Sequence, residues 1–303
     1  MNEIMKKSSE LNQDTNSIDE LFQRSLRFRD TYEFFSFFKF IGKVLHYSHY
    51  NAMLVYWQNK DVKYFGTPGY WKNKFGRTVK ENARPYVIIV PFGPAALAYD
   101  LYETEGEESP EEFINRGLRG GIFKINGNLP EVLLKEIIQN LAEYNISVEF
   151  KYFLFNKGGE TYDYSDNSVK IFVSSDFSPE QAFATLIHEL AHNFLGHLGE
   201  KYLIKKSHKI DEKKEGEKLE KIHIKARNVS SSIREIEAEV VSYIVCSRWN
   251  LEKDPLEYIS WHISQENLSK ISVEKIIKVA DKIENTFLEN FNHKFNDKLK
   301  MEL

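Results

Sequence analysis

The chain has 303 residues, a formal net charge of −4, one cysteine and a hydrophobic content of 42%. This length allows two modest domains, and the apolar content is sufficient for packed cores. A single cysteine, Cys246, leaves no partner for an internal disulfide, and the polar first residues lack the apolar segment of a secretory signal. The negative net charge excludes a general attraction to nucleic acid, so such binding requires a local basic patch. We therefore expect a cytoplasmic globular protein.

The beginning of the chain predicts a tail followed by helices. Residues 1–18 are polar and show no sustained periodicity, so we expect them to be disordered. Over residues 21–59 the apolar positions recur at helical spacing with an interruption near Gly42, which predicts two helices or one bent helix. The most apolar stretch, residues 34–41, contains Lys39 and is far shorter than the ~20 residues that span a bilayer. We expect a buried helix there and no membrane partner.

The next stretch predicts short strands. Residues 64–84 are rich in turn formers, and the β-branched run at 86–91 is typical of a buried strand. A second strand is expected at 96–102, followed by an acidic block of the kind that usually forms solvated surface. Several glycines then indicate a linker. We place a boundary near residue 125 and assign residues 19–125 to a first domain.

The second predicted domain, residues 126–303, mixes helix and strand signals. Ser178, Pro179 and Glu180 have the N-cap and first-turn chemistry of a helix start. The charged insertion at 201–227 is expected to be a solvated helix or a mobile loop. Together these patterns predict an α+β protein of two domains. The other expected elements are strands at 146–155 and 169–173 and helices at 129–144, 232–249 and 273–292.

One pentapeptide, His188-Glu189-Leu190-Ala191-His192, has the pattern of a metal site. On a helix it places two imidazoles one turn apart with a carboxylate between them. The apolar positions of residues 183–194 share the neighbouring face, so the histidines flank the buried side of the helix. This arrangement is typical of sites that bind a divalent ion and activate water.

A catalytic zinc site usually has a third protein ligand. His197 is one residue short of the HExxHxxGxxH spacing, and in a continuous helix it points about half a turn away from the pair, so we interpret it as a surface or supporting histidine. Glu235 and Glu239 stand at i and i+4 on one face of a later helix, where two like charges need a cation beside them. We assign Glu235 to the metal and Glu239 to the free N–H of a ligand histidine.

Two alternatives remain for this acidic helix. Glu237 points away from the face and is expected to be solvated or paired with Arg234 or a lysine, and its ligation in place of Glu235 is one alternative. In the other, all three glutamates form an ordinary charged surface. Cys246 is three turns beyond Glu235, too far to ligate beside it, and is interpreted as a small core residue.

With His188, His192 and Glu235 around zinc, the expected chemistry is peptide-bond hydrolysis. The metal would bring the pKa of a bound water toward ~7, and Glu189 would take its proton and later pass it to the leaving amine. Mn²⁺ and Co²⁺ also suit this ligand set. The donor to the tetrahedral oxyanion stays open among Tyr162, Tyr164 and Tyr243.

Two motifs, TLIHELAHNFLGH at 185–197 and EIEAE at 235–239, follow a turn and a strand. With this lead-in, residues from about 129 to 250 resemble the ImmA/IrrE family of metallopeptidase domains. The resemblance implies a zincin-like fold in which the HExxH helix packs on a small sheet. It also implies that Glu235 is the third metal ligand.

A basic and aromatic segment, residues 60–84, is the remaining functional signal. Its cations outnumber its acids, and aromatic residues are interleaved with them. Sequence-tolerant binding of single strands uses this combination, although core aromatics and ordinary surface lysines would give the same composition. The residues expected to contact DNA are Lys60, Lys63, Trp71, Lys72, Lys74, Arg77, Lys80 and Arg84.

Three stretches of the first domain, YSHYNAMLVYWQN at 47–59, GYWKNKFGRTVKENARPYVIIVPF at 69–92 and YDLYETEG at 99–106, resemble the N-terminal domain of the ArdC antirestriction family. The resemblance implies a domain that binds single-stranded DNA, joined to a metallopeptidase domain, with a role on mobile DNA. We therefore expect an ArdC-like protein with a zinc-dependent peptidase site and a protein or peptide substrate. One alternative is a non-catalytic DNA-binding or protein-blocking module with a structural metal. Another is an ImmA-like regulatory protease that cleaves a repressor.

Overall fold

The computed structural model describes residues 31–44, 47–62, 64–90, 95–113, 131–153, 158–205, 221–249, 251 and 262–288. Within them, helices and four small sheets form a mixed α+β structure, which confirms the predicted class. The predicted tail at 1–18 and the predicted boundary near residue 125 lie outside the described residues. None of the described helices is long and apolar enough to cross a membrane.

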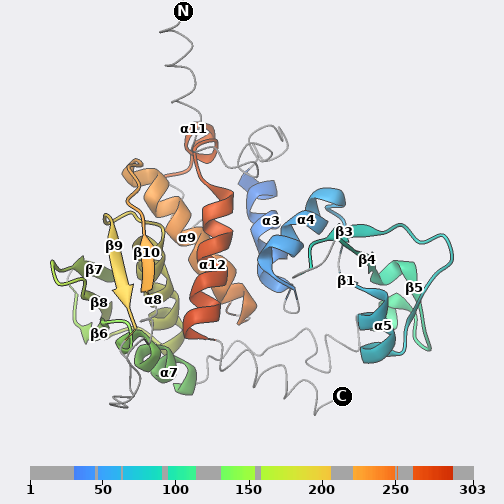
Figure 1. Ribbon diagram of the computed structural model, residues 1–303, viewed down its shortest axis with the longest axis horizontal. Helices are drawn as coiled ribbons and strands as arrows, with labels where there is room; N and C mark the ends of the chain where they lie inside the picture. The colour runs from blue at the N-terminus through green and yellow to red at the C-terminus, as the bar shows by residue number, and fades with distance from the viewer. Residues whose placement is uncertain are drawn as a thin grey trace, which may run out of the picture.

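Helix α9 (Ser231–Arg248) is the centre of the helical core. Helices α8 (Pro179–Phe194), α3 (Thr31–Lys43) and α12 (Val273–Phe287) pack against it, as Figure 1 shows. A helix with partners on several sides must bury most of its faces. Between Ile236 and Cys246 every side chain of α9 is accordingly buried. Helix α3 comes especially close, because a Cβ on its Gly42 would lie only 2.7 Å from the Cβ of Ser247.

A three-stranded sheet supports α8. Its order is β6 (Ile146–Lys151), β8 (Val169–Ser174), β7 (Gly159–Asp163), with β8 parallel to β6 and antiparallel to β7. Alternate residues of β8, Val169, Ile171 and Val173, point into the core, as expected for a strand with one buried face. The strand leads through a short turn into α8. Helix α7 (Glu131–Ala142) precedes β6 and is the helix predicted at 129–144.

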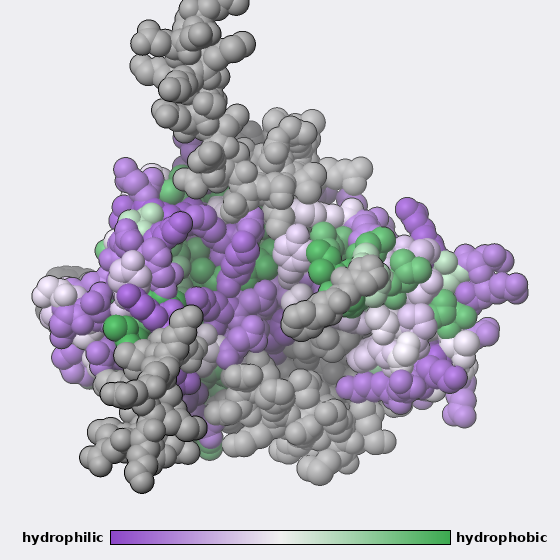
Figure 2. All heavy atoms as spheres, viewed as in Figure 1, coloured by the Kyte–Doolittle hydropathy of each residue, from purple (hydrophilic) through white to green (hydrophobic). Residues whose placement is uncertain are grey.

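A second sheet, β1 (Phe65–Gly66), β4 (Ala96–Asp100) and β3 (Tyr86–Ile88), is antiparallel and lies beside helix α4 (His49–Gln58). Val87, Ile89 and Leu97 of this region have exposed apolar side chains. Figure 2 shows apolar surface in this part of the molecule. The 3₁₀ helix Leu101–Glu103 and the short pair β2 (Thr78–Val79) and β5 (Thr104–Glu105) complete this region.

Helix α5 (Pro68–Phe75) occupies a stretch that the sequence predicted as turns. Thr67 caps its start by accepting from the N–H of Tyr70, and Gly76 ends it with a φ of +63°. Proline just inside a helix and glycine just beyond it are boundary signals as well as turn signals. The prediction was wrong because it assigned both residues to turns.

The predicted insertion also differs from expectation, because its described ends are strands. Residues Lys201–Ile204 (β9) pair antiparallel with Lys221–Ile224 (β10). Buried Leu203, Ile222 and Ile224 alternate with more exposed residues, which is the pattern of a strand with one covered face. The high charge content of the surrounding residues obscured two strands of only four residues each. A short helix, α11 (Gln265–Leu268), precedes α12.

The free edge of β3 is covered by side chains of α4. Asn51 donates to the carbonyl of Ile89 at 2.8 Å and accepts from its N–H at 2.9 Å. Gln58 makes the same pair of bonds with Val87, at 2.9 and 2.8 Å. Each amide therefore takes the place of a neighbouring strand, which protects an edge that would otherwise invite pairing with another chain.

Replacing Asn51 with alanine should destabilise this edge. Asn51 is buried, so its loss leaves two backbone groups without partners, and we expect the free energy of unfolding to fall by about 1–3 kcal/mol. Gln58→Ala removes equivalent bonds at an exposed position where water can replace them, and should cost less. Urea unfolding of both variants checks this, and equal losses would contradict the role of burial.

Candidate metal centre

Helix α8 has a well-defined start that fixes where its histidines lie. Ser178 and Gln181 form a capping box, in which the Ser178 hydroxyl accepts from the Gln181 N–H and the Gln181 side chain accepts from the Ser178 N–H at 3.0 Å. Pro179 occupies the first turn, where its missing N–H has no cost. The apolar face of α8 is buried through Leu186, Ile187 and Leu190.

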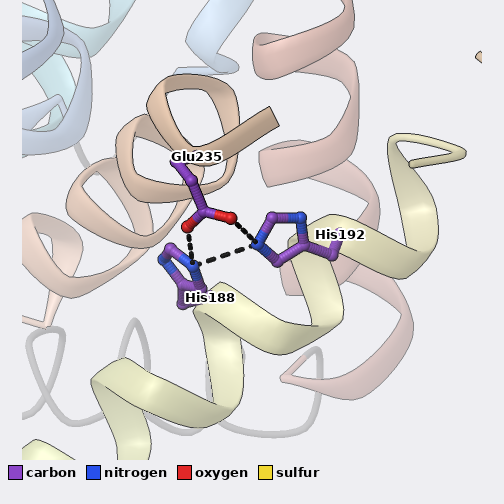
Figure 3. A group of neighbouring side chains, drawn as sticks. All are labelled: His188, His192 and Glu235. Carbon is purple, nitrogen blue, oxygen red and sulfur yellow. Dashed lines mark hydrogen bonds and ion pairs between the residues drawn. The ribbon is translucent and has the colours of Figure 1, made fainter. Parts of the chain in front are cut away.

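His188 and His192 of α8 converge with Glu235 of α9 on one point (Figure 3). The two Nε2 atoms are 3.1 Å apart. Glu235 places Oε2 3.4 Å from Nε2 of His188 and Oε1 3.6 Å from Nε2 of His192. A tetrahedral ion with bonds of about 2.0–2.1 Å has ligand atoms roughly 3.3 Å apart, so the spacing and the chemistry of the three donors fit zinc.

The charge of Glu235 favours a cation in this triangle. Burial alone would raise the pKa of Glu235, but its contacts with His188 and His192 outweigh that effect and hold the pKa well below the usual range. The carboxylate therefore stays ionised between two imidazole nitrogens. Two nitrogens that face each other beside a carboxylate are best satisfied by a shared positive ion.

Glu239, predicted to orient a ligand histidine, lies one turn beyond Glu235. Its Oε2 is 3.0 Å from Nδ1 of His188. A carboxylate can only accept, so this contact places the proton of His188 on Nδ1 and leaves the lone pair of Nε2 toward the triangle. Glu239 is 1% exposed, which makes the contact a buried one.

His197 is buried next to His192, so the surface position that we considered for it is wrong, whereas a supporting role stays a prediction. Helix α8 ends at Phe194 in a Schellman motif, where the N–H of His197 donates to the carbonyl of His192 and that of Gly196 to Asn193, both at 3.1 Å. The chain therefore turns back over the last helical turn. This brings Nδ1 of His197 within 3.0 Å of Nδ1 of His192.

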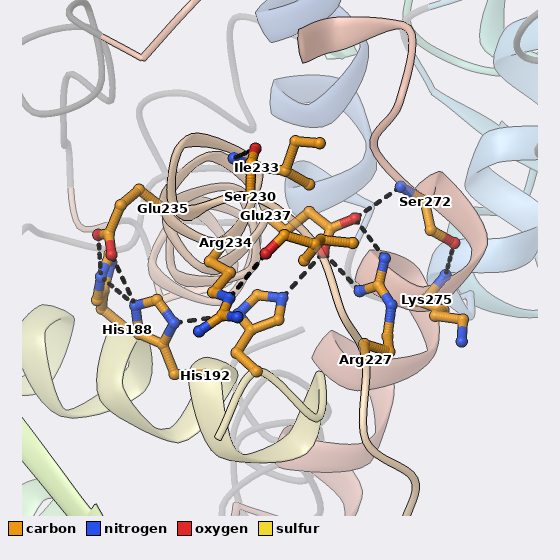
Figure 4. A network of polar contacts seen from close by, with 12 residues as sticks. His188, His192, Arg227, Ser230, Ile233, Arg234, Glu235, Glu237, Ser272 and Lys275 are labelled. Atoms are coloured by element: carbon orange, nitrogen blue, oxygen red, sulfur yellow. Dashed lines mark hydrogen bonds and ion pairs between the residues drawn. The ribbon is translucent and has the colours of Figure 1, made fainter. Parts of the chain in front are cut away.

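Glu237 was expected to be solvated or paired with Arg234 or a lysine, and this was also wrong. It is fully buried and accepts from Arg227 at 2.5 and 3.0 Å and from the N–H of Ser272 at 2.7 Å (Figure 4). Its Oε2 also lies 3.0 Å from Nε2 of His197. Burial would raise the pKa of Glu237, but these contacts outweigh it and lower the pKa. These contacts hold the Glu237 carboxylate away from the triangle. Glu235 is the glutamate that lies beside His188 and His192.

Glu189, the expected general base, faces β7. A Cβ added to Gly159 of that strand would lie 3.1 Å from its Oε1, so the absence of a side chain at Gly159 makes room for the carboxylate. Of the three tyrosines considered for the oxyanion, Tyr243 is buried against Phe35, whereas Tyr162 and Tyr164 are exposed. Cys246 is buried in the core, as predicted.

A second group with metal-binding side chains, His49, Asp281 and Glu284, has the geometry of ion pairs. Nδ1 of His49 lies 2.7 Å from Asp281, and its Nε2 lies 3.7 Å from Glu284. The two ring nitrogens face different carboxylates, and one imidazole cannot turn both toward a single ion. Arg248 lies 3.2 Å from the same oxygen of Glu284 and would repel a cation there. We interpret this group as a buried ion-pair network between α4, α9 and α12.

The basic segment contributes fewer exposed cations than predicted. Trp71 is 1% exposed and donates to the carbonyl of Tyr99, and Arg77 is 2% exposed and donates to Thr104 and Glu108. The prediction that Trp71 and Arg77 contact DNA was wrong, because their polar groups bind other parts of the protein. Lys63 lies outside the described residues. The exposed cations are Lys60, Lys72, Lys80 and Arg84, while Lys74 is half-buried.

Comparisons of the chain with protein-family models, with curated proteins and with solved structures found no match.

Replacing Gly196 with alanine should disrupt the turn that carries His197. Gly196 has a φ of +75°, and an added Cβ would lie 2.0 Å from the carbonyl oxygen of Lys225. Gly76→Ala is the matched control, because Gly76 has a φ of +63° but no atom within 4 Å of an added Cβ. A left-handed alanine costs about 1–2 kcal/mol, which is the loss expected for the control. Urea unfolding should show a clearly larger loss for Gly196→Ala, and equal losses would contradict the tight contact with Lys225.

Proposed function

We propose that the chain is a zinc-dependent peptide hydrolase. The observation that carries the proposal is the triangle of His188, His192 and Glu235, whose ligand atoms lie 3.1–3.6 Å apart. Three protein ligands leave a fourth position for water or substrate, which distinguishes catalytic zinc sites from closed structural ones. A zinc ion held there would act as a Lewis acid and bring the pKa of a coordinated water toward about 7.

In this proposal, Glu189 carries out the proton transfers. It follows His188 on the same helix and is 8% exposed, so its carboxylate is mostly shielded from bulk water. In the proposed reaction Glu189 accepts the proton of the attacking water and donates it to the leaving amine. Mn²⁺ or Co²⁺ would serve the same donors.

Strand β7 supports the choice of an extended peptide as substrate. It is an edge strand in its sheet, as far as the described residues show, and its Gly159 adjoins Glu189. An extended peptide can add to such an edge through main-chain hydrogen bonds. The bond to be cleaved would then lie beside the general base.

Exchange of Glu189 for glutamine separates catalysis from metal binding. Glu189→Gln should retain zinc and lower hydrolysis of an unfolded protein substrate by about 10²–10⁴-fold, whereas His188→Ala should lose both. Glu266→Gln is the control, because Glu266 is an exposed glutamate on α11 that forms an ion pair with Lys270, four residues further along. Metal content and proteolysis are measured on the same preparations. Full proteolysis in Glu189→Gln would contradict the proposed role.

The same variants distinguish the alternatives. A biological effect that is lost in His188→Ala but kept in Glu189→Gln would favour a non-catalytic, ArdC-like module with a structural metal. An effect that requires Glu189 would favour a protease, including one that cleaves a repressor.

Binding of single-stranded DNA stays a prediction, now with a smaller set of residues. Lys72→Glu and Arg84→Glu change exposed side chains and should weaken binding and reduce its dependence on salt, because each phosphate contact contributes about 0.7 to the salt slope for single strands. Lys225→Glu changes an exposed lysine between β10 and α9 and serves as the control. Titrations with labelled oligonucleotide at several salt concentrations measure both quantities. If all three changes had equal effects on affinity and on its salt dependence, the binding surface would have to lie elsewhere.

A further inference from the structure

His192 is connected to a chain of buried groups that leads away from the metal triangle. Its Nδ1 contacts Nδ1 of His197, and Nε2 of His197 contacts Glu237, each at 3.0 Å. His197 and Glu237 are 3% and 0% exposed. Water therefore does not compete for these contacts, and their geometry constrains the imidazole of His192.

Glu237, the last group in this series of contacts, determines the direction of the hydrogen bonds. Arg227 donates two hydrogen bonds to Glu237 and balances its charge. The carboxylate only accepts, so Nε2 of His197 carries a proton. With the charge of Glu237 already balanced, a neutral His197 is sufficient, and its Nδ1 accepts from the Nδ1–H of His192. His192 is left with a bare Nε2 directed toward His188 and Glu235.

We propose that His197 and Glu237 are positioning residues of the metal site. They fix the tautomer and ring orientation of His192, as Glu239 does for His188. The two ligand histidines are thus held by two different carboxylates of α9, one directly and one through an intervening imidazole. This inference rests on the metal-binding part of the proposed function and does not require peptide hydrolysis.

The chain of contacts also reaches the start of α12. Ser272 is the N-cap of α12, and its N–H donates to Oε1 of Glu237 at 2.7 Å. A metal held by His192 would make its Nδ1–H a better donor and would so strengthen the contact with His197. Because coupling between two binding events is reciprocal, a bound metal should stabilise the first turn of α12.

Zinc affinity, measured by competition with a chromophoric chelator, tests the positioning role. His197→Ala should bind zinc about 10–100-fold more weakly than the wild type. His197→Asn should recover most of this loss, because its Oδ1 can accept the same hydrogen bond as the imidazole Nδ1. His223→Ala is the control. His223 stacks on Tyr202 of the β9–β10 pair and is not part of this series of buried contacts, so its removal should leave zinc affinity unchanged.

Hydrogen exchange tests the connection to α12 without relying on the alanine variant. Zinc should slow exchange of the Ser272 amide in the wild type, and this effect should be absent in His197→Asn, which keeps the contact with His192 but loses the donor to Glu237. A merely structural role for His197 would leave the zinc effect the same in both proteins.

The outcomes separate this inference from the proposed function. If the wild type binds zinc and His197→Ala binds it equally well, the positioning role is overturned and the proposed function stands. If the wild type binds no zinc, both are overturned.

Discussion

Two buried carboxylates of α9, Glu237 and Glu239, determine how helices α8 and α9 meet at the candidate metal site. Each is paired with an imidazole, Glu239 with His188 of α8 and Glu237 with His197 just beyond it. An unpaired buried carboxylate costs several kcal/mol, so any shift of α8 along α9 would be strongly unfavourable. The same register brings Glu235 opposite His188 and His192. The relative positions of the three side chains therefore follow from helix packing.

The parts of the site that depend only on helical geometry could be predicted from the sequence. His188 and His192, and likewise Glu235 and Glu239, are four residues apart, and one turn of helix is enough to place each pair on a common face. His197 could not be placed in this way, because its position depends on where α8 ends. The available signal was Gly196, a glycine just after an apolar helical run, which predicts a Schellman turn and a reversal of the chain.

The long-range contacts could not be predicted from local patterns. The partners of Glu237 are Arg227, His197 and Ser272, and none of them is its neighbour on α9. Arg77 lies in a segment whose composition is typical of nucleic-acid binding. It is nevertheless buried, and it contacts residues about 30 positions later in the sequence, Glu108 among them. Composition does not distinguish a buried arginine from an exposed one. Arginine suits buried positions because its planar donors can bind several acceptors at once.

X-ray absorption at the zinc edge of the purified protein tests the central claim most directly, because it reports the ligands around the ion. The account predicts a four-coordinate zinc with two imidazole ligands and oxygen donors at about 2.0–2.2 Å. The signature of two imidazoles should disappear in a protein that carries His188→Ala and His192→Ala. A sulfur ligand, or an ion surrounded by six oxygen atoms, would contradict the assignment of His188, His192 and Glu235.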